Sequence, residues 1–448
     1  MSSENTVQQN TESSRKAVLY TLVTLSIPTI LEEILSTLLQ FVDTAMVGHL
    51  GEKATAAVST TTTINWLIGS LPGAVGVAAL ALIARAVGAK DHEKVHRLAG
   101  QVLLLSTVIG AVMEMIALFL SPYIPVWMGA AADIRAEASL YFTIISIPLI
   151  PRTWTRILAS AIRATRDTRT PMLITFTENV LNVILNATLI YGLGWGVKGA
   201  AVASAVSFAV GGFLMLFVFC RNSSLHFELR CLLPDTDILR QCVTISLPAL
   251  FNNLISCLGY VVFAGMVSGM GTVIFAAHSI AIQAEEIVYL PGYGFRTATG
   301  TLVGNALGER NEKKLRYTEQ LSILITIGIM FIGGLLLYLF AYPLMSIFTS
   351  SEQVTALGAR ALRMVAFSEP FFGLMIVIEG IFYGMGETRQ PFVIESCSMW
   401  FVRILFTFLC VKVWHLGLFA VWGCMIADNV FKAVMLLVCF VRKHPKTL

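Results

Sequence analysis

Residues 26–51, SIPTILEEILSTLLQFVDTAMVGHLG, decide the fold: the stretch is long enough to cross a bilayer, yet it carries Glu32, Glu33 and Asp43. It recurs 220 residues later as SLPALFNNLISCLGYVVFAGMVSGMG at 246–271. The match continues without a gap from 26–94 onto 246–314, with sixteen identities in 69 positions. Phe263 takes the place of Asp43 in the second copy. One unit was therefore duplicated, and only the first copy keeps acid in its first span.

The composition places the chain in a bilayer. Of 448 residues, 56% are hydrophobic and 13% are charged, whereas a soluble domain has about 25% charged residues. The apolar residues form blocks of twenty or more, each enough to cross a hydrocarbon core of ~30 Å, and such unbroken runs exclude a β-barrel. We expect an all-α polytopic membrane protein that does not bind nucleic acid. The eight cysteines lack metal-ligand spacing and are expected to be free thiols.

The apolar blocks predict twelve transmembrane helices. They cover 18–47, 55–82, 98–121, 136–158, 170–191, 197–220, 240–267, 274–303, 318–341, 356–384, 391–413 and 417–441. Lys and Arg are concentrated in alternate connections, which places both termini in the cytoplasm. Because the repeat spans six helices, an even number, both halves insert in the same orientation as a parallel pseudo-two-fold repeat.

The expected domains follow from this repeat. A disordered cytoplasmic tail (1–17) precedes an N-terminal six-helix lobe (18–220). The polar linker 221–238 leads to a C-terminal six-helix lobe (239–441) and a short cytoplasmic tail (442–448). A multi-pass protein of the plasma (inner) membrane is expected, with a cavity between the halves.

Several loops and spans together resemble one family. They are VDTAMVGHLG at 42–51, IARAVGAKDHEKV at 83–95, VGNALGERNEKKL at 303–315, AAHSIAIQAEE with LPGYGF at 276–295, and GETRQP at 386–391. In this order, and duplicated, they resemble the MATE (multidrug and toxic compound extrusion) family over essentially the whole chain. The resemblance implies two six-helix lobes that open to one side at a time, and the export of organic cations or other amphiphiles in exchange for Na⁺ or H⁺.

Asp43 is the main candidate for the ion-coupling group. A charge near the bilayer centre costs about 2.5–3.5 kcal/mol on insertion scales, so Asp43 should face the lobe interior or a water-filled cavity; the alternative is an acid merely solvated at the end of its span. In the family resembled, the Asp of the VDT stretch is the coupling acid of the first lobe. Glu32 and Ser36 lie on nearly the same face of this helix as Asp43, and Gln40 flanks that face. These polar side chains would either hydrate the interior of the lobe or pack against polar neighbours.

Span five supplies partners for Asp43. Asn182 and Asn186 share one face at i, i+4 spacing, and Glu178 extends that face; the alternative role of the amides is ordinary hydrogen bonding between helices. Related members carry Asn and then Asp at the two positions, so Asn186 departs from that pattern. Ser204 matches the family's hydroxyl in span six. One carboxylate favours H⁺ as the coupling ion, although Asp43, Asn182 and Asn186 could also hold Na⁺.

The second half carries different acids. Glu285 and Glu286 in span eight are expected to attract a cationic substrate or to carry a proton, and the alternative is a pairing with Arg296. Glu369 and Glu379 in span ten compete with the first lobe as the place of cation coupling, while Glu395/Arg403 and Asp428/Lys432 are expected to be neutralising pairs. The expected substrate cavity is lined by Gln40, Trp66, Tyr141, Phe263, Gln283, Glu285, Glu286 and Tyr289. Pro28 would act as a hinge or as a static kink in span one.

Two functions remain open from the sequence. The first is a secondary antiporter for small amphiphilic or cationic molecules, acting as a monomer with no cofactor. The second is a lipid-linked oligosaccharide flippase of the same superfamily, which the arginines at the end of span four (Arg152, Arg156 and Arg163) would suit. An enzyme is not expected, since nucleophile and His–acid motifs are missing, and neither is ATP, since no P-loop occurs.

Overall fold

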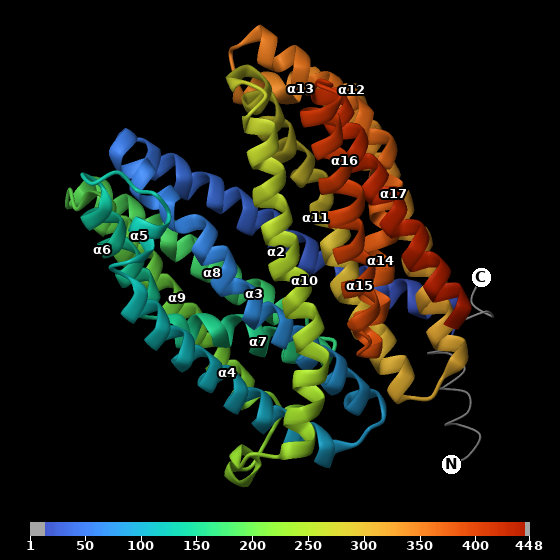
Figure 1. Ribbon diagram of the computed structural model, residues 1–448. Coiled ribbons are helices and arrows are strands. Elements are labelled where there is room, and N and C mark those ends of the chain that lie inside the picture. The colour runs from blue at the N-terminus through green and yellow to red at the C-terminus, as the bar shows by residue number, and fades with distance from the viewer. Residues whose placement is uncertain (1–13, 444–448) are drawn as a thin grey trace. The chain divides into compact units, whose positions relative to one another are not determined.

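A computed structural model describes residues 14–443, and within that range every regular element is a helix. The first half consists of α2 (Arg15–Gly48), α3 (Glu52–Gly88), α4 (His92–Leu120), α5 (Ile124–Trp127), α6 (Arg135–Ser146), α7 (Leu149–Ala164), α8 (Arg169–Asn186), the π-helix η1 (Ala187–Gly192) and α9 (Gly196–Arg221). Figure 1 shows these elements in blue to green.

The second half repeats this order after a short connection. It consists of η2 (Leu229–Leu232), α10 (Thr236–Ser268), α11 (Thr272–Gly308), α12 (Glu312–Phe348), α13 (Glu352–Val365), η3 (Ala366–Ser368), α14 (Glu369–Met385), α15 (Arg389–Cys397), η4 (Ser398–Ile404), α16 (Leu405–Phe408), η5 (Leu409–Val413) and α17 (Leu418–Lys443). The predicted twelve membrane helices are therefore present. Eleven of them, within the described residues, are long and apolar enough to cross a bilayer unbroken.

The remaining span, predicted as one helix over 136–158, is divided into α6 and α7. Pro148 lacks a backbone N–H, and its own backbone leaves helical geometry (φ −91°, ψ 34°) while Ile147 before it is still helical, so the helix breaks at the proline. The amide of Ile150, in the first turn of α7, donates 3.3 Å to a carboxylate oxygen of Glu114 on α4. An acid in the middle of an apolar span thus satisfies a backbone donor that the break exposes.

The internal repeat extends to turn geometry. Gly51 and Gly271, 220 residues apart, both precede a long helix with positive φ, 105° and 118°, a conformation that glycine adopts without steric cost. Asp91 and Asn311, also 220 residues apart, each cap the next helix by accepting a 3.0 Å hydrogen bond from the N–H three residues later. The duplication read from the sequence therefore reproduces helix caps and connections.

The chain forms two compact units whose borders differ from the predicted lobes. Unit 1 comprises the chain up to Ile30 and from Pro248 onward, and unit 2 comprises residues 31–247. The borders fall inside α2 and α10 because the first part of each helix packs into the other half's unit. Leu22 clusters with Phe295 of unit 1, and Cys242 clusters with Leu98 of unit 2.

The predicted linker is anchored to unit 2. Gln101 of α4, which is 1% exposed, donates to the carbonyls of Cys231 and Leu233 at 2.7 and 2.6 Å and accepts 3.0 Å from the amide of Asp235. Arg97, one turn earlier, forms an ion pair with Asp235. Of the predicted tails, Arg15 onward and Arg442–Lys443 are helical, while 1–13 and 444–448 lie outside the described residues.

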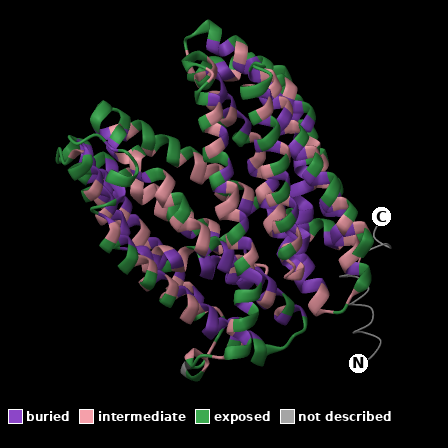
Figure 2. Cartoon of the chain, viewed as in Figure 1, coloured by how far each residue is buried: buried purple, intermediate pink, exposed green. Residues whose placement is uncertain are grey.

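Each unit has one central helix around which the others pack. In unit 2, α7 contacts α3, α4 and α9, and in unit 1, α14 contacts α11, α12 and α17. Small residues at these contacts let the backbones approach closely: Ala78, Ala161 and Ala164 are fully buried in unit 2. Figure 2 shows exposed residues on the outer faces of the long helices and buried residues between them.

Candidate functional site

Four of the predicted coupling residues form one chain of hydrogen bonds in unit 2. The amide of Asn186 donates to a carboxylate oxygen of Asp43 and, at 3.0 Å, to the side-chain oxygen of Asn182. Asn182 in turn donates 3.1 Å to the hydroxyl of Ser204. The chain therefore connects α2, α8 and α9. Its role in ion coupling remains a prediction.

The local backbone explains how these side chains meet. Asn182 and Asn186 are one turn apart on α8 and face the same way. Directly after Asn186 the chain widens into the π-helix η1, a feature frequent at functional sites. The hydroxyl of Tyr191 in η1 donates 3.1 Å to the carbonyl of Met46, which ties this segment to α2 three residues beyond Asp43.

The charge of Asp43 is not paired. Within residues 14–443 no ion pair is made to its carboxylate, and Asn186, its donor, is neutral. The side-chain oxygen of Asn186 is buried and has no hydrogen-bond partner. Tyr141 interacts electrostatically with Asp43 and with Arg152. The site can take up a positive charge, either as a proton on Asp43 or as a cation held by Asp43 and the amide oxygens.

Glu178 lies two turns before Asn186 and outside the hydrogen-bonded chain. One of its carboxylate oxygens is buried without a hydrogen-bond partner, and Gly211 leaves it room, because a Cβ at that position would clash with the carboxylate. Its charged neighbours are Arg156, Arg152 and Glu32. Arg152 donates 3.3 Å to the side-chain oxygen of Asn65. Glu178 is thus placed to balance two arginines inside unit 2.

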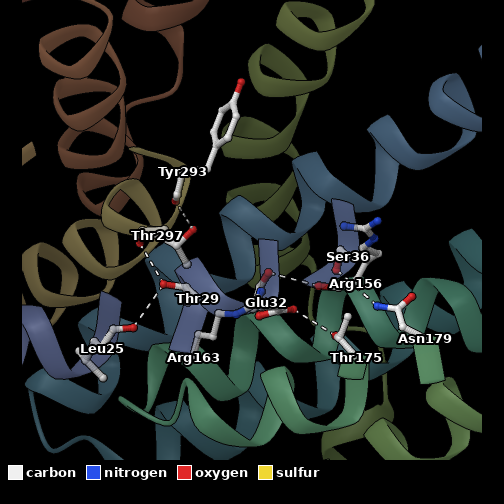
Figure 3. A network of polar contacts seen from close by, with 12 residues as sticks. Leu25, Thr29, Glu32, Ser36, Arg156, Arg163, Thr175, Asn179, Tyr293 and Thr297 are labelled. Atoms are coloured by element: carbon white, nitrogen blue, oxygen red, sulfur yellow. Dashed lines mark hydrogen bonds and ion pairs between the residues drawn. The ribbon is translucent and has the colours of Figure 1, made fainter. Parts of the chain in front are cut away.

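Glu32 lies in a separate polar network of unit 2. Arg163 donates to both of its carboxylate oxygens at 2.6 and 2.7 Å, and Thr175 adds a hydrogen bond of 3.1 Å. Asn179 reaches Ser36 at 3.5 Å on the same helix faces, as Figure 3 shows. Of the two expectations for the stripe of polar residues on α2, packing against polar neighbours is confirmed for Glu32.

The corresponding network of unit 1 places the carboxylate on the other helix. Residues 32 and 175 correspond to 252 and 395 across the repeat of 220, and Asn252 donates 2.7 Å to Glu395. The acid of this contact thus lies on α2 in the first half and on α15 in the second. The prediction that Glu395 pairs with Arg403 is wrong, because Arg403 binds Asp428 at 3.0 Å.

The other acids of unit 1 are distributed as follows. Asp428 pairs with Lys432 at 2.9 Å, as predicted. Arg296, the expected partner of Glu285 or Glu286, pairs with Glu379 at 3.1 Å instead. Of the expected cavity residues, Gln40, Trp66, Gln283 and Glu286 are exposed, Tyr289 is half-buried, and Glu285, Tyr141 and Phe263 are buried. Phe263 packs in the core between His278 and Arg403, and the substrate cavity that it was expected to line stays a prediction.

Several polar residues were missed from the sequence. The missed residues that make the contacts described above are Glu114, Asn65 and Gln101. Each is a polar residue within a mostly apolar helix, so the hydrophobic pattern of that helix does not single it out. A polar side chain inside an apolar span is itself the signal that would have found them, because such a group is costly in lipid without a partner.

The MatE family model matches residues 28–188 and 248–409. The chain belongs to the MatE family. The two matched segments correspond to the two halves of the internal repeat. Members of this family are membrane transporters, so the MatE fold here is that of a transporter and not of an enzyme.

Similar proteins cover nearly the whole MatE chain. "Probable multidrug resistance protein NorM" of Thermotoga maritima is 27% identical over 427 residues, 94% of this chain and 91% of the relative. The outward-facing structure of a multidrug resistance MATE family transporter of the MOP superfamily has a TM-score of 0.90 at 25% identity and covers 96% of this chain and 97% of its own. A Pyrococcus furiosus transporter of the MOP superfamily, described as having a binding pocket of reverse polarity that suggests a different function, has a TM-score of 0.89 at 26% identity, with 95% and 96% covered.

Proposed function

We propose that this protein exports small cationic or amphiphilic molecules across the inner membrane in exchange for protons, with both of its termini in the cytoplasm. The observation that carries the proposal is Asp43, a carboxylate in a membrane helix whose hydrogen-bond donor, Asn186, is a neutral amide. The likeness to proteins named for multidrug resistance supports the substrate class.

The coupling step follows from electrostatics. Ionised Asp43 is stabilised by the hydrogen bond from Asn186, and an approaching organic cation offers a compensating charge. Protonation removes that charge and with it the attraction for the cation. Substrate and proton therefore compete for one carboxylate, which enforces exchange. Pro28, where the ladder of helix hydrogen bonds is interrupted, would let α2 bend when the charge is lost.

Protons suit this site better than Na⁺. A sodium ion must lose most of its water and benefits from several oxygens and full negative charge, whereas the coupling chain holds one carboxylate and two amide oxygens. Glu178 would supply a second charge only by turning away from Arg152 and Arg156. A single embedded carboxyl is sufficient to carry one proton per cycle.

Dye transport in inside-out vesicles tests the proposal, with a ΔpH and a Na⁺ gradient imposed separately. We expect ΔpH alone to drive uptake and Asp43→Asn to abolish it while insertion and expression are retained. Asp91→Asn, which alters only an exposed helix cap, is the matched control and should transport normally. Normal ΔpH-driven uptake by Asp43→Asn would contradict the coupling assignment, whereas uptake that follows Na⁺ alone would contradict the choice of ion.

A second function is favoured by one observation. Arg152 and Arg156 are placed beside Glu178 inside unit 2, and a basic interior suits an anionic or pyrophosphate-linked substrate. A strain that lacks its own exporters and is grown on a cationic dye distinguishes the two functions. Resistance conferred by this chain supports the first, and dye sensitivity together with restored lipid-linked sugar transfer supports the second.

A further inference from the structure

Two of the eight cysteines are in contact in unit 1. The Sγ atoms of Cys410 and Cys424 lie 3.8 Å apart. Cys410 belongs to the π-helix η5 and Cys424 to α17, and these two elements pack against each other. Both residues are buried, with 7% and 8% of their surface exposed. Two thiols that touch across two helices can react with each other, whereas an isolated buried cysteine acts only as a small apolar side chain.

The backbone around Cys410 holds this contact in place. The chain turns back from η5 through residues 414–417 into α17. The amide of Leu416 donates 2.8 Å to the carbonyl of Cys410, and the amide of Trp414 donates 2.9 Å to the carbonyl of Leu409. These hydrogen bonds close the end of η5. The position of Cys410 beside α17 is therefore fixed by a short, hydrogen-bonded connection.

The two thiols lie on apolar elements. Within six residues of Cys424, α17 contributes to a buried hydrophobic cluster the side chains of Leu418, Val421, Trp422 and Met425. Asp428, one turn after Cys424, is bound to Arg403 and Lys432. Within residues 14–443, no group of three or more His, Cys, Asp or Glu side chains gathers as a metal site would require. These surroundings favour the chemistry of a dithiol, which is oxidation to a disulfide.

The two thiols lie towards the end of α17 that the charge distribution places outside the cytoplasm. The opposite end of α17 carries Arg442 and Lys443, and such basic residues mark the cytoplasmic side. Residues 414–417, next to Cys410, are then on the outer side. Disulfides form and persist in oxidising compartments outside the cytoplasm and are rare within it. This placement rests on the proposed topology, whereas the contact between the sulfurs does not.

We propose that Cys410 and Cys424 are a redox-active pair that a small disulfide of the outer compartment oxidises to a disulfide bond. The thiolate of one cysteine attacks the oxidant's disulfide and releases one thiol, and the thiolate of the other cysteine then displaces the second thiol. Two protons and two electrons pass to the oxidant, whose S–S bond breaks as the new one forms. The sulfurs approach to about 2 Å, and the bond ties η5 to α17.

Tryptic peptide mapping of the purified full-length protein tests the pair, because Lys412 lies between the two cysteines. Trypsin places Cys410 on the peptide 404–412 and Cys424 on the peptide 413–432. The folded protein is incubated with oxidised glutathione, then unfolded and alkylated without a reductant. We expect mass spectrometry to find the two peptides joined, and to find them separate once a reductant is added.

Cys242 and Cys257 are the matched control within the same sample. Both are buried, but they lie 15 residues apart on α10, about 22 Å along the helix axis. They are too far apart to bond to each other. Their common peptide, 241–296, should therefore carry two alkyl groups with and without oxidised glutathione.

The outcomes separate a redox-active pair from two packed thiols. Peptides that stay separate after oxidised glutathione overturn the proposal, and so does glutathione that remains attached to one cysteine without closure of the bond. Cys410→Ser should give no joined peptide, and the main test uses the parent chain, so it needs no variant to fold. An incorrect topology would appear in labelling from the two sides of the membrane and leave the joined peptides unaffected, so the two hypotheses fail separately.

Discussion

Asn186 stands where the resemblance to the MATE family implies an aspartate, next to the proposed coupling acid Asp43. It donates to Asp43, so an aspartate there would put two carboxylates in contact, and like charges at that range require a proton or a cation between them. We expect Asn186→Asp to increase the Na⁺ dependence of transport at fixed pH, measured as rate against Na⁺ concentration. Asn179→Asp, on the same helix but facing Ser36, should behave like the parent. An unchanged Na⁺ response in Asn186→Asp would show that Asp43 and Asn186 do not bind the cation together.

Asp235 precedes α10, outside the membrane spans, and depends on Arg97. The hydrogen bond from Arg97 is the main cause that lowers the pKa of Asp235 below its ordinary value. A lowered pKa in the folded protein stabilises the fold above the unfolded pKa, and this contribution is lost as pH falls through the folded pKa. We expect Arg97→Gln to have a lower Tm than the parent at neutral pH, with a difference that shrinks towards acidic pH. Asp235→Asn should remove the same pH dependence, and the double variant should lose no more than either single one.

Single residues also mark the limit of what the sequence predicts. The pair Asp428/Lys432 has i, i+4 spacing on an ordinary helix, and the structure has it. The pair Glu395/Arg403 was expected as a neutralising pair but does not form, since eight residues rise about 12 Å along a helix. Arg403 lies in the π-helix η4 and binds Asp428 instead. Helix type inside an apolar span leaves little trace in composition.

At the scale of elements, the contact between α2 and α11 within unit 1 depends on a glycine. A Cβ on Gly294 would lie 2.9 Å from the backbone nitrogen of Ile30, and Thr29 donates 3.1 Å to the carbonyl of Gly294. We expect Gly294→Ala to destabilise the protein by about 1–3 kcal/mol because the helices must separate, seen as a lower Tm. Gly265→Ala, at a helix position with nothing within 4 Å, should be neutral or stabilising by up to about 1 kcal/mol. Equal Tm values for the two variants would refute the close-packing explanation.

The connection between the halves is held by Gln101. Its three hydrogen bonds to the backbone at 231, 233 and 235 contribute about 1 kcal/mol each. We expect Gln101→Leu to release the connection, which limited trypsin digestion would detect as faster cleavage after Arg230. Gln353→Leu, at an exposed position of α13, is the control and should digest at the parent's rate. Cleavage that is no faster in Gln101→Leu would show that other contacts hold the connection.

The apolar blocks of the sequence predict where the helices lie, but they predict the breaks within those helices less well. The block 136–158 reads as one span, yet the chain breaks at Ile147–Pro148 and Glu114 accepts the amide of Ile150. The break depends on a partner from another helix, which a single segment does not reveal. The cluster of Asp43, Asn182, Asn186 and Ser204 was predictable because the family resemblance supplied the partners that spacing alone left open.

At the scale of the whole molecule, the two halves share their helices and connections but carry their charged residues at different positions. The contact between residues 32 and 175 recurs between 252 and 395, but the acid lies on opposite members of the two pairs. Arg163, which neutralises Glu32, corresponds to Tyr383 in the second half. Duplication therefore fixed the positions of polar contacts, while each half evolved its own carboxylates. This accounts for a coupling candidate in unit 2 that has no acidic counterpart in unit 1.

The topology of the whole chain follows from its positive charges and is open to direct test. Lys198 and Lys313 are both exposed, in the first turns of α9 and α12, and the distribution of Lys and Arg places the first outside and the second in the cytoplasm. In a background without the eight natural cysteines, Lys198→Cys should react with a membrane-impermeant maleimide on intact cells. Lys313→Cys should react only after permeabilisation or in inside-out vesicles. Six helices separate equivalent positions of the two halves, so the parallel repeat requires the two labels to react from opposite sides. If only one label reacts from the unexpected side, the parallel repeat is contradicted. If both do, the termini lie outside.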